Sequence, residues 1–325
     1  MLPQCPIMPT EDDLYLIDVI VPIYKVDPEF IATCLNSIKN QTMVSWRCYI
    51  IDGTPDDWSG WQEMQDAIIP FLTDFRFKYD VQSGTGVSQA RNQAIEDGGS
   101  DFVAFLDGDD YWLPQHLSEL YSAIEPSDES TVLWFTAVES QISIQSPKTG
   151  EIYTKVGVLN NWRDFYRLDP VDSYWYLRSR PVITSAVCVR RSRMDAIDGF
   201  DTTMDCGEDV DYWLRLVKPN FAAQQLDVIS VGRVNGTHKT TQFGPQSSAY
   251  DKHGGDPAAI KQAYLDQMDN NYLTTHPDPT DADRRPEMDD DYWDWLTYSK
   301  GSLPLLLLGN AVAANVSTDS RSELE

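Results

Sequence analysis

Positive charge is scarce in this sequence. Of its 325 residues, 25 are lysine or arginine and 51 are aspartate or glutamate, which gives a formal net charge of −26 at pH 7. A surface this acidic repels nucleic acid and anionic lipid, and no run of basic residues offers a local exception. We therefore expect nucleic acid to be an unlikely partner.

Cysteine is also sparse, and its pattern excludes two kinds of site. The five cysteines are odd in number and scattered, and no two of them form a C-x-x-C pair. Neither a disulfide framework nor a zinc site is therefore indicated, and free thiols in a reducing compartment are expected. The cysteines are Cys5, Cys34, Cys48, Cys188 and Cys206.

Long hydrophobic runs are absent. The longest apolar run, residues 303–314, is interrupted by proline, glycine and asparagine and is too short to span a bilayer. Residues 1–13 have neither a basic start nor a long apolar core, so we expect no secretory signal there. These features predict a cytoplasmic protein with no transmembrane segment.

Strand and helix patterns alternate along the first 125 residues. Short apolar, β-branched runs predict strands, and apolar residues at helical spacing between them predict helices. This alternation is typical of an α/β fold with a mostly parallel, doubly wound sheet flanked by helices. We expect Asp27 to be the N-cap of the first helix, and Pro70 to kink or shorten the second. The expected strands are 16–24, 46–51, 77–81 and 102–106, and the expected helices are 28–38, 61–75, 87–95 and 115–124.

The rest of the chain is predicted to complete this domain and then to change character. We expect strands at 131–139, 181–190 and 226–234, a hairpin over 141–159, and a helix within 206–216. From about residue 244, proline, aspartate and glycine become frequent between helical stretches. We expect a catalytic domain over residues 1–245 and a C-terminal helical extension, residues 246–325, packed on it.

Acidic residues follow directly on the fourth expected strand. The apolar run 102–106 ends at Asp107, Gly108, Asp109 and Asp110. Ligands of open α/β sheets bind beyond the carboxyl ends of the strands, and Mg²⁺ or Mn²⁺ prefers carboxylate oxygens together with substrate phosphates. The sequence therefore favours a divalent-metal site at this loop, with a solvated acidic turn as the alternative.

Seven short motifs, in this order, resemble those of the family 2 glycosyltransferases with the A-type fold. The resemblance covers roughly residues 16–240 and implies a nucleotide-sugar donor, most commonly UDP-linked, a divalent metal ion (Mn²⁺ or Mg²⁺), and direct transfer with inversion. The motifs are VIVPIY at 19–24, CLNSIKNQT at 34–42, YIIDGTPDD at 49–57, GVSQARNQAI at 86–95, FLDGDDYWLPQHL at 105–117, GFD at 199–201 and EDVDYWLRL at 208–216.

The resemblance also implies roles for individual residues. Pro22, Tyr24 and Asp52 are expected to line the nucleoside pocket. Arg91 is expected to contact the phosphates or base, and Asp107 the ribose. Asp109 and His238 are the expected metal ligands, and Asp209, in E-D-x-D with Glu208, is the expected catalytic base.

The chemistry of sugar transfer agrees with two separate acids. A cation held against the departing diphosphate stabilises the negative charge that develops on it. An acceptor hydroxyl is a poor nucleophile, and a carboxylate that takes its proton typically contributes about 10²- to 10⁴-fold. Asp109 and Asp209 come from different segments, as a metal site and a base on opposite sides of the sugar require.

Each assignment has a structural alternative. Asp52 could cap a strand-to-helix turn, and Arg91 could be a surface helix residue paired with Glu96. The remaining alternatives concern local structure: Asp110 as a helix cap, Glu208 and Asp209 as first-turn acids favoured by the helix dipole, His238 as an ordinary loop residue, and Trp112, Tyr212 and Trp213 as packing residues.

Two other functions remain open at this point. A nucleotidyltransferase also uses acidic metal ligands, but it would need a basic, glycine-rich phosphate loop near the first strand, where only Lys25 is present. A catalytically silent binding module on the same fold is the second. The acceptor is a glycan, a lipid or another hydroxyl-bearing molecule, and a homodimer is compatible with the sequence.

Overall fold

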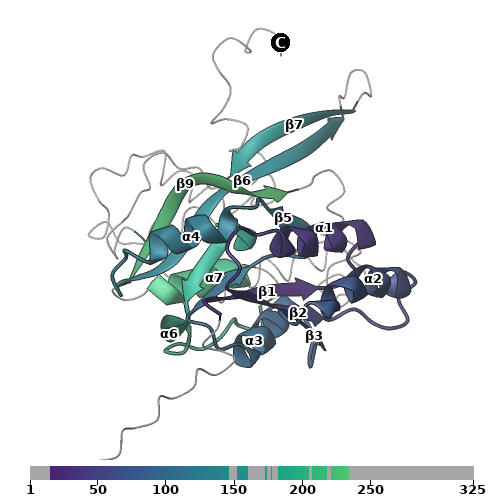
Figure 1. Ribbon diagram of the computed structural model, residues 1–325, viewed down its shortest axis with the longest axis horizontal. Helices are drawn as coiled ribbons and strands as arrows, with labels where there is room; N and C mark the ends of the chain where they lie inside the picture. Colours follow the sequence, from purple (N-terminus) through teal and green to yellow (C-terminus); the bar gives the residue numbers. More distant parts are fainter. Residues whose placement is uncertain are drawn as a thin grey trace, which may run out of the picture.

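A nine-stranded mixed sheet organises the described residues of the computed structural model (Figure 1). Its strand order is β3-β2-β1-β4-β8-β6-β9-β5, and β7 pairs with β6 beside this path. The structure describes residues 15–145, 152–159, 173, 177, 182–204, 207–217 and 221–233. The α/β fold class expected from the sequence is therefore confirmed.

The N-terminal half is parallel and agrees with the expected order of elements. β1, β2, β3 and β4 pair in parallel, with helices in the connections. The elements are β1 (Ile17–Ile23), α1 (Pro28–Lys39), β2 (Trp46–Asp52), α2 (Trp61–Ile68), the 3₁₀ helix η2 (Ile69–Thr73), β3 (Phe77–Val81), α3 (Val87–Asp97) and β4 (Phe102–Phe105).

Local sequence explains where the first two helices begin and end. The Asp27 carboxylate accepts a hydrogen bond from the Glu29 backbone N–H at 2.9 Å, and Pro28 occupies the first helical position of α1. Pro70 lacks the N–H that an α-helix requires, so α2 ends at Ile68 and the chain continues as η2.

The second half of the sheet is mixed. β8 is antiparallel to β4 and β6, β9 is parallel to β6, and β5 is antiparallel to β9. The elements are β5 (Asp110–Trp112), α4 (His116–Ile124), β6 (Thr131–Gln145), β7 (Ile152–Leu159), the 3₁₀ helix η3 (Thr184–Ala186), β8 (Val187–Arg190), α6 (Arg191–Met194), α7 (Glu208–Val217) and β9 (Ala222–Arg233).

Four differences from the sequence expectation lie in this half. β6 runs unbroken through residue 140 into the hairpin with β7, which extends from the body in Figure 1. The apolar segment 181–190 forms a strand only from Val187, because residues 184–186 turn as η3. β9 begins at Ala222, and β5 was not expected at all. The pairing partners of these strands are far away in the sequence, so local patterns do not specify them.

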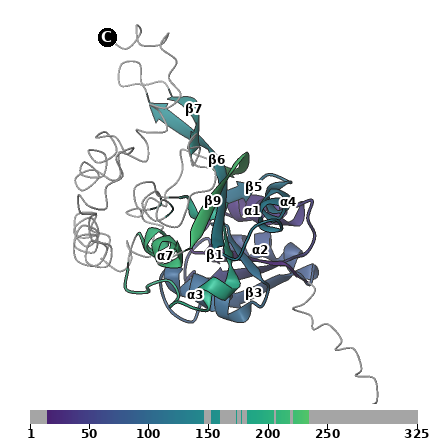
Figure 2. The ribbon, with the colours of Figure 1, turned by 90° about the vertical axis from the view of Figure 1, so that its left-hand side faces the viewer.

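Helices cover both faces of the sheet. Residues of α1, α2 and α4 pack with alternate residues of β1, such as Val19 and Val21, in one core. Residues of α3 and α7 pack with the opposite face, which includes Ile20, in a second core. Figure 2 shows α7 on the side of the sheet away from α1, α2 and α4. Burial on both faces explains why these strands are continuously apolar.

Some sequence predictions fall outside the described residues. These are the helical extension 246–325 and His238. Within the described part of the chain, no helix combines the length and apolar character needed to cross a bilayer.

Candidate active site

The acidic loop lies at the carboxyl end of β4, where the fold predicts a ligand site. Asp107 and Asp109 are half-buried, and Asp110 is buried at 1% exposure. Gly108 lets the loop approach β1 closely, because a Cβ there would lie 2.9 Å from Cγ2 of Ile23. The loop is therefore held against the end of β1 by backbone, with two of its acids reaching the surface.

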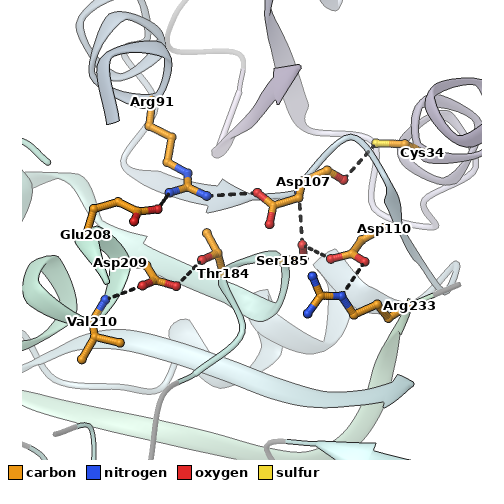
Figure 3. Close-up of polar contacts among 10 residues, drawn as sticks. All are labelled: Cys34, Arg91, Asp107, Asp110, Thr184, Ser185, Glu208, Asp209, Val210 and Arg233. Carbon is orange, nitrogen blue, oxygen red and sulfur yellow. Dashed lines mark hydrogen bonds and ion pairs between the residues drawn. The ribbon is translucent and has the colours of Figure 1, made fainter. Parts of the chain in front are cut away.

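Arg91 joins this loop to α7, the helix that carries the candidate base Asp209 (Figure 3). One terminal nitrogen of its guanidinium donates to Asp107 Oδ1 at 3.0 Å, and the other donates to Glu208 Oε1 at 2.9 Å. Arg91 is 3% exposed, so it is not a surface helix residue paired with Glu96, and that alternative is wrong. One buried cation thus holds together acids from β4 and α7.

Glu208 and Asp209 open α7, and both have perturbed acidity. Burial and, after it, the charge of Asp209 raise the pKa of Glu208 to about 7, against the lowering effect of Arg91. Burial also raises the pKa of Asp209, against the lowering effect of Arg91 and of hydrogen bonds from Val210 N–H and the Thr184 hydroxyl. Carboxylates with raised pKa values are typical of proton-transfer sites.

An aromatic cluster fixes α7 on the sheet. Trp213 packs edge-on against Phe105 of β4 at a centroid distance of 5.4 Å, and Tyr212 lies 4.1 Å from the ring of Phe200. Tyr212 and Trp213 are each 1% exposed and Trp112 is 2% exposed, so the interpretation of these three aromatics as packing residues is confirmed. The cluster determines where the first turn of α7 and its two acids lie.

The GFD motif, residues 199–201, is hydrogen-bonded to Asn92, the residue after Arg91. Asn92 donates to the Phe200 carbonyl and accepts from the Phe200 N–H, both at 2.8 Å. Gly199 gives this side chain room, because a Cβ there would lie 2.5 Å from Asn92 Oδ1. The Phe200 ring lies 5.3 Å from the Arg91 guanidinium, a distance at which cation–π attraction operates.

Asp110 contacts residues that come much later in the sequence than the helix that follows it. The hydroxyl of Ser185 donates to Asp110 Oδ2 at 2.6 Å, and Arg233 Nε lies 3.3 Å from Oδ1. Burial raises the pKa of Asp110 to about 7, and Arg233 opposes that shift. Helix α4 begins at His116 with Gln115 before it, so the idea that Asp110 caps a helix is wrong.

Pro22, Tyr24 and Asp52 lie together at the ends of β1 and β2. Ile23 pairs with Asp52 in register, and Pro22 and Tyr24 on either side of it are half-buried. The Asp52 carboxylate is 2% exposed and accepts from Thr54 N–H at 2.8 Å, Gln65 Nε2 at 2.8 Å and Tyr79 OH at 2.7 Å. It therefore shapes a turn after β2, and α2 begins only at Trp61.

The acidic loop could supply only some of the ligands of a divalent cation. Among the residues the structure describes, no three or more His, Cys, Asp or Glu side chains form a metal-binding group. Mg²⁺ and Mn²⁺ sites, however, commonly use one or two protein carboxylates and take further oxygens from substrate phosphates. Asp109, half-buried beside Asp107, offers a donor set of that kind.

The structure brings most of the expected site residues to one edge and adds several others. Asp107, Arg91, Glu208 and Asp209 form one contact network, while His238 lies outside the described residues. The sequence prediction missed the site's neutral supports and one cation. They are Asn92, Thr184, Ser185, Phe200 and Arg233, of which only Asn92 and Phe200 lie in the quoted motifs.

Comparison with known proteins finds one family model and several partial relatives. Residues 18–176 match the model of the glycosyl transferase family 2. The chain is 37% identical over 97 residues to the glycosyltransferase EpsJ of Bacillus subtilis, covering 30% of this chain and 26% of EpsJ. It is 30% identical over 107 residues to the glucosyltransferase WfgD of Escherichia coli, covering 32% of this chain and 39% of WfgD. The matched part thus spans well under half the length of these relatives.

Solved structures confirm the fold. Residues 1–349 of TarS from S. aureus, crystallised with UDP-GlcNAc, superpose with a TM-score of 0.53 at 14% sequence identity. The match covers 81% of this chain and 76% of that structure. At this identity the similarity establishes a shared architecture, which is that of the A-type glycosyltransferases.

Proposed function

Residues 18–176 belong to glycosyl transferase family 2, and on that premise we propose that this chain is a metal-dependent, inverting glycosyltransferase. It moves a sugar from a nucleoside-diphosphate donor, with UDP as the expected carrier, to a hydroxyl of a glycan, lipid or other acceptor. Residues 1–245 are the proposed catalytic domain, with 246–325 as an extension of it.

The observation that carries this proposal is the double ion pair of Arg91. Its contacts to Asp107 and Glu208 bring the strand-end acids and the α7 acids to opposite sides of one guanidinium. A single displacement needs one acidic group for the leaving group and another for the attacking hydroxyl, because these occupy opposite faces of the sugar, and Arg91 joins two such acidic groups. The Asp107 side chain is 29% exposed, so the acid at this end of the ion pair can still contact a donor, whereas Glu208 at the other end is buried.

Asp209 is the proposed general base. Its carboxylate takes the proton of the acceptor hydroxyl while that oxygen attacks the anomeric carbon. The bond from the anomeric carbon to the diphosphate oxygen breaks, and its electron pair leaves with the nucleoside diphosphate. Attack opposite the leaving group inverts the anomeric configuration. Glu208, paired with Arg91, keeps the start of α7 oriented toward the donor.

Asp109 is the proposed metal ligand, with His238 as a further ligand. When bound, Mn²⁺ or Mg²⁺ stabilises the negative charge that develops on the diphosphate. Asp107 accepts a hydrogen bond from Arg91 and is the proposed contact to the ribose or nearby donor groups. Arg91 is the proposed contact to the phosphates or base, because its two bonds to carboxylates use only two of the five N–H donors of a guanidinium.

Pro22, Tyr24 and Asp52 are the proposed nucleoside pocket. The three internal donors to Asp52 hold its carboxylate in place, and a carboxylate has about four acceptor positions, so one is left for a base N–H. A uridine donor is supported by WfgD, whose name specifies UDP-Glc as donor and a diphosphoundecaprenol-linked acceptor.

A thermal-shift panel tests this function. Nucleoside diphosphates and their sugars are added with and without Mn²⁺, and UDP with Mn²⁺ is expected to raise the melting temperature of the wild type. Asp109→Ala should remove that increase. Asp101→Ala, which deletes an exposed carboxylate at the opposite end of β4, should retain it. Equal stabilisation of wild type and Asp109→Ala contradicts the proposed metal site.

A further inference from the structure

We propose that Thr184 and Ser185 are positioning residues that divide the proposed reaction between them. Thr184 orients the base Asp209 for the acceptor, and Ser185 orients the acidic loop for the donor. The inference rests on the proposed function, and it concerns two neutral residues that lie outside the family motifs. Both belong to η3, a single turn that faces the site in Figure 3.

The Ser185 hydroxyl both accepts a hydrogen bond from the acidic loop and donates one to it. The hydroxyl accepts from the Asp107 N–H at 3.1 Å and donates to Asp110 Oδ2 at 2.6 Å. The Ser185 carbonyl accepts from the indole N–H of Trp112 at 2.7 Å. Three bonds from one residue therefore hold the loop on both sides of Asp109, the residue between Asp107 and Asp110.

Thr184 acts on the other side of the turn. Its hydroxyl donates to Asp209 Oδ2 at 3.0 Å, while Asp209 Oδ1 accepts from the Val210 N–H at 2.8 Å. One oxygen of the proposed base is thus fixed by its own helix and the other by η3. The carboxylate plane is determined by these two bonds together.

The turn itself is well suited to transmit position. Thr184 is 4% exposed and Ser185 is fully buried, and the turn leads directly into β8, which pairs with both β4 and β6. Adjacent residues of a buried turn cannot shift independently by much, because their packing is dense. We therefore expect η3 to fix the spacing between the base and the acidic loop, which catalysis requires to be held within about 0.5 Å.

The two residues are expected to affect different kinetic constants. Thr184→Val keeps the side-chain shape and removes the donor to Asp209, so kcat should fall about 10-fold or more while the donor KM stays within about 2-fold. Thr184→Ser keeps a hydroxyl and should restore kcat. Ser185→Ala frees the acidic loop, so the donor KM should rise about 10-fold.

Two control variants test whether removing a buried hydroxyl elsewhere in the fold changes the kinetic constants. Thr131→Val removes a fully buried hydroxyl that has no hydrogen-bond partner in the described structure. Ser100→Ala removes a 2.7 Å hydrogen bond to the buried carboxylate of Asp18, near the start of β4 and away from the site. Both should leave kcat and the donor KM unchanged, even if Ser100→Ala lowers the melting temperature.

The test is steady-state transfer from the nucleotide sugar by all five variants and the wild type. A kcat loss in Thr184→Val that Thr184→Ser repairs, together with a KM increase in Ser185→Ala, supports the proposal. If Ser185→Ala does not fold, Ser185→Cys, with its weaker donor, should show a smaller KM increase. Wild-type kcat in Thr184→Val overturns the positioning role and leaves the proposed function intact. No transfer by the wild type from any nucleotide sugar overturns both.

Discussion

Arg91 and Glu208 lie 117 positions apart in the sequence, and their side chains meet at 2.9 Å in the buried centre of the candidate site. Arg91 belongs to α3 in the parallel half of the sheet, and Glu208 opens α7 beside the mixed half. The pair therefore couples the two halves of the fold at the place where their acids converge. Its integrity should matter for stability as well as for transfer.

Breaking this pair from one side should be costly. Arg91→Met leaves the buried Glu208 without its cation, and removing one partner of a buried ion pair typically costs about 3–5 kcal/mol. Arg91→Met/Glu208→Gln removes the unpaired charge and should recover about 1 kcal/mol or more. Urea unfolding of the wild type, both single variants and the double variant measures the coupling.

A surface pair provides the control for this cycle. Arg76 and Asp74 bond at 2.7 Å, but their side chains are 20% and 19% exposed. Arg76→Met should therefore cost no more than about 1 kcal/mol. Strictly additive single-variant effects at Arg91 and Glu208 would show that the two residues are not energetically coupled, contrary to the geometry.

The contact between Gly199 and Asn92 predicts a second coupling. An alanine Cβ at 199 meets Asn92 Oδ1 at 2.5 Å, and Asn92 cannot turn away without losing both bonds to Phe200. Gly199→Ala should therefore destabilise the fold by about 1–3 kcal/mol. In the Asn92→Ala background the same substitution should cost less than about 0.5 kcal/mol, since the clash is gone. Chemical denaturation of the wild type, the two single variants and the double variant measures these costs. An equal cost of Gly199→Ala in both backgrounds would show that the clash with Asn92 is not the cause of the destabilisation.

His116 predicts a specific loss of stability in acid. It is fully buried, its Nδ1 lies 2.8 Å from Ser230 Oγ, and burial lowers its pKa to about 3. The unfolded chain binds a proton below about pH 6.5, the ordinary value for histidine, whereas the folded chain does not until about pH 3. The stability that comes from keeping His116 neutral in the folded state is therefore fully present above pH 6.5 and is lost as the pH falls toward 3.

His116→Gln isolates the effect. The difference in unfolding free energy between wild type and variant should be constant above pH 7. Below pH 6.5 it should shrink by up to about 1.4 kcal/mol per pH unit. Urea titrations at unit intervals from pH 8 to pH 4 measure it. A difference that does not change with pH would mean that His116 is protonated to the same extent in both states.

The sequence predicted the first half of the fold well because its signals are local. The cap at Asp27, the break at Pro70 and the apolar runs of β1, β2 and β4 each depend on residues a few positions apart. The second half depends on distant partners. Asp110 to Trp112 form a strand only because β9 lies beside them.

The candidate site divides in the same way. Its acids could be identified in the sequence because charged residues interrupt apolar patterns or stand in recurrent motifs. Thr184 and Ser185 lie in the apolar segment PVITSAVCVR, which predicts an uninterrupted strand, so their contacts to Asp209 and Asp110 have no local signal. Arg233 likewise becomes a site residue only through the pairing of β5 with β9.

Donor affinity and transfer rate in Asp209→Asn test the central claim most directly, with Asp227→Asn, an exposed acid on β9, as control. Calorimetry with UDP and Mn²⁺ should give the same affinity for the wild type and both variants, because the amide keeps the shape of the base. Single-turnover transfer should fall about 10²- to 10⁴-fold in Asp209→Asn alone, since the amide accepts no proton. Transfer at the wild-type rate by Asp209→Asn would contradict the account.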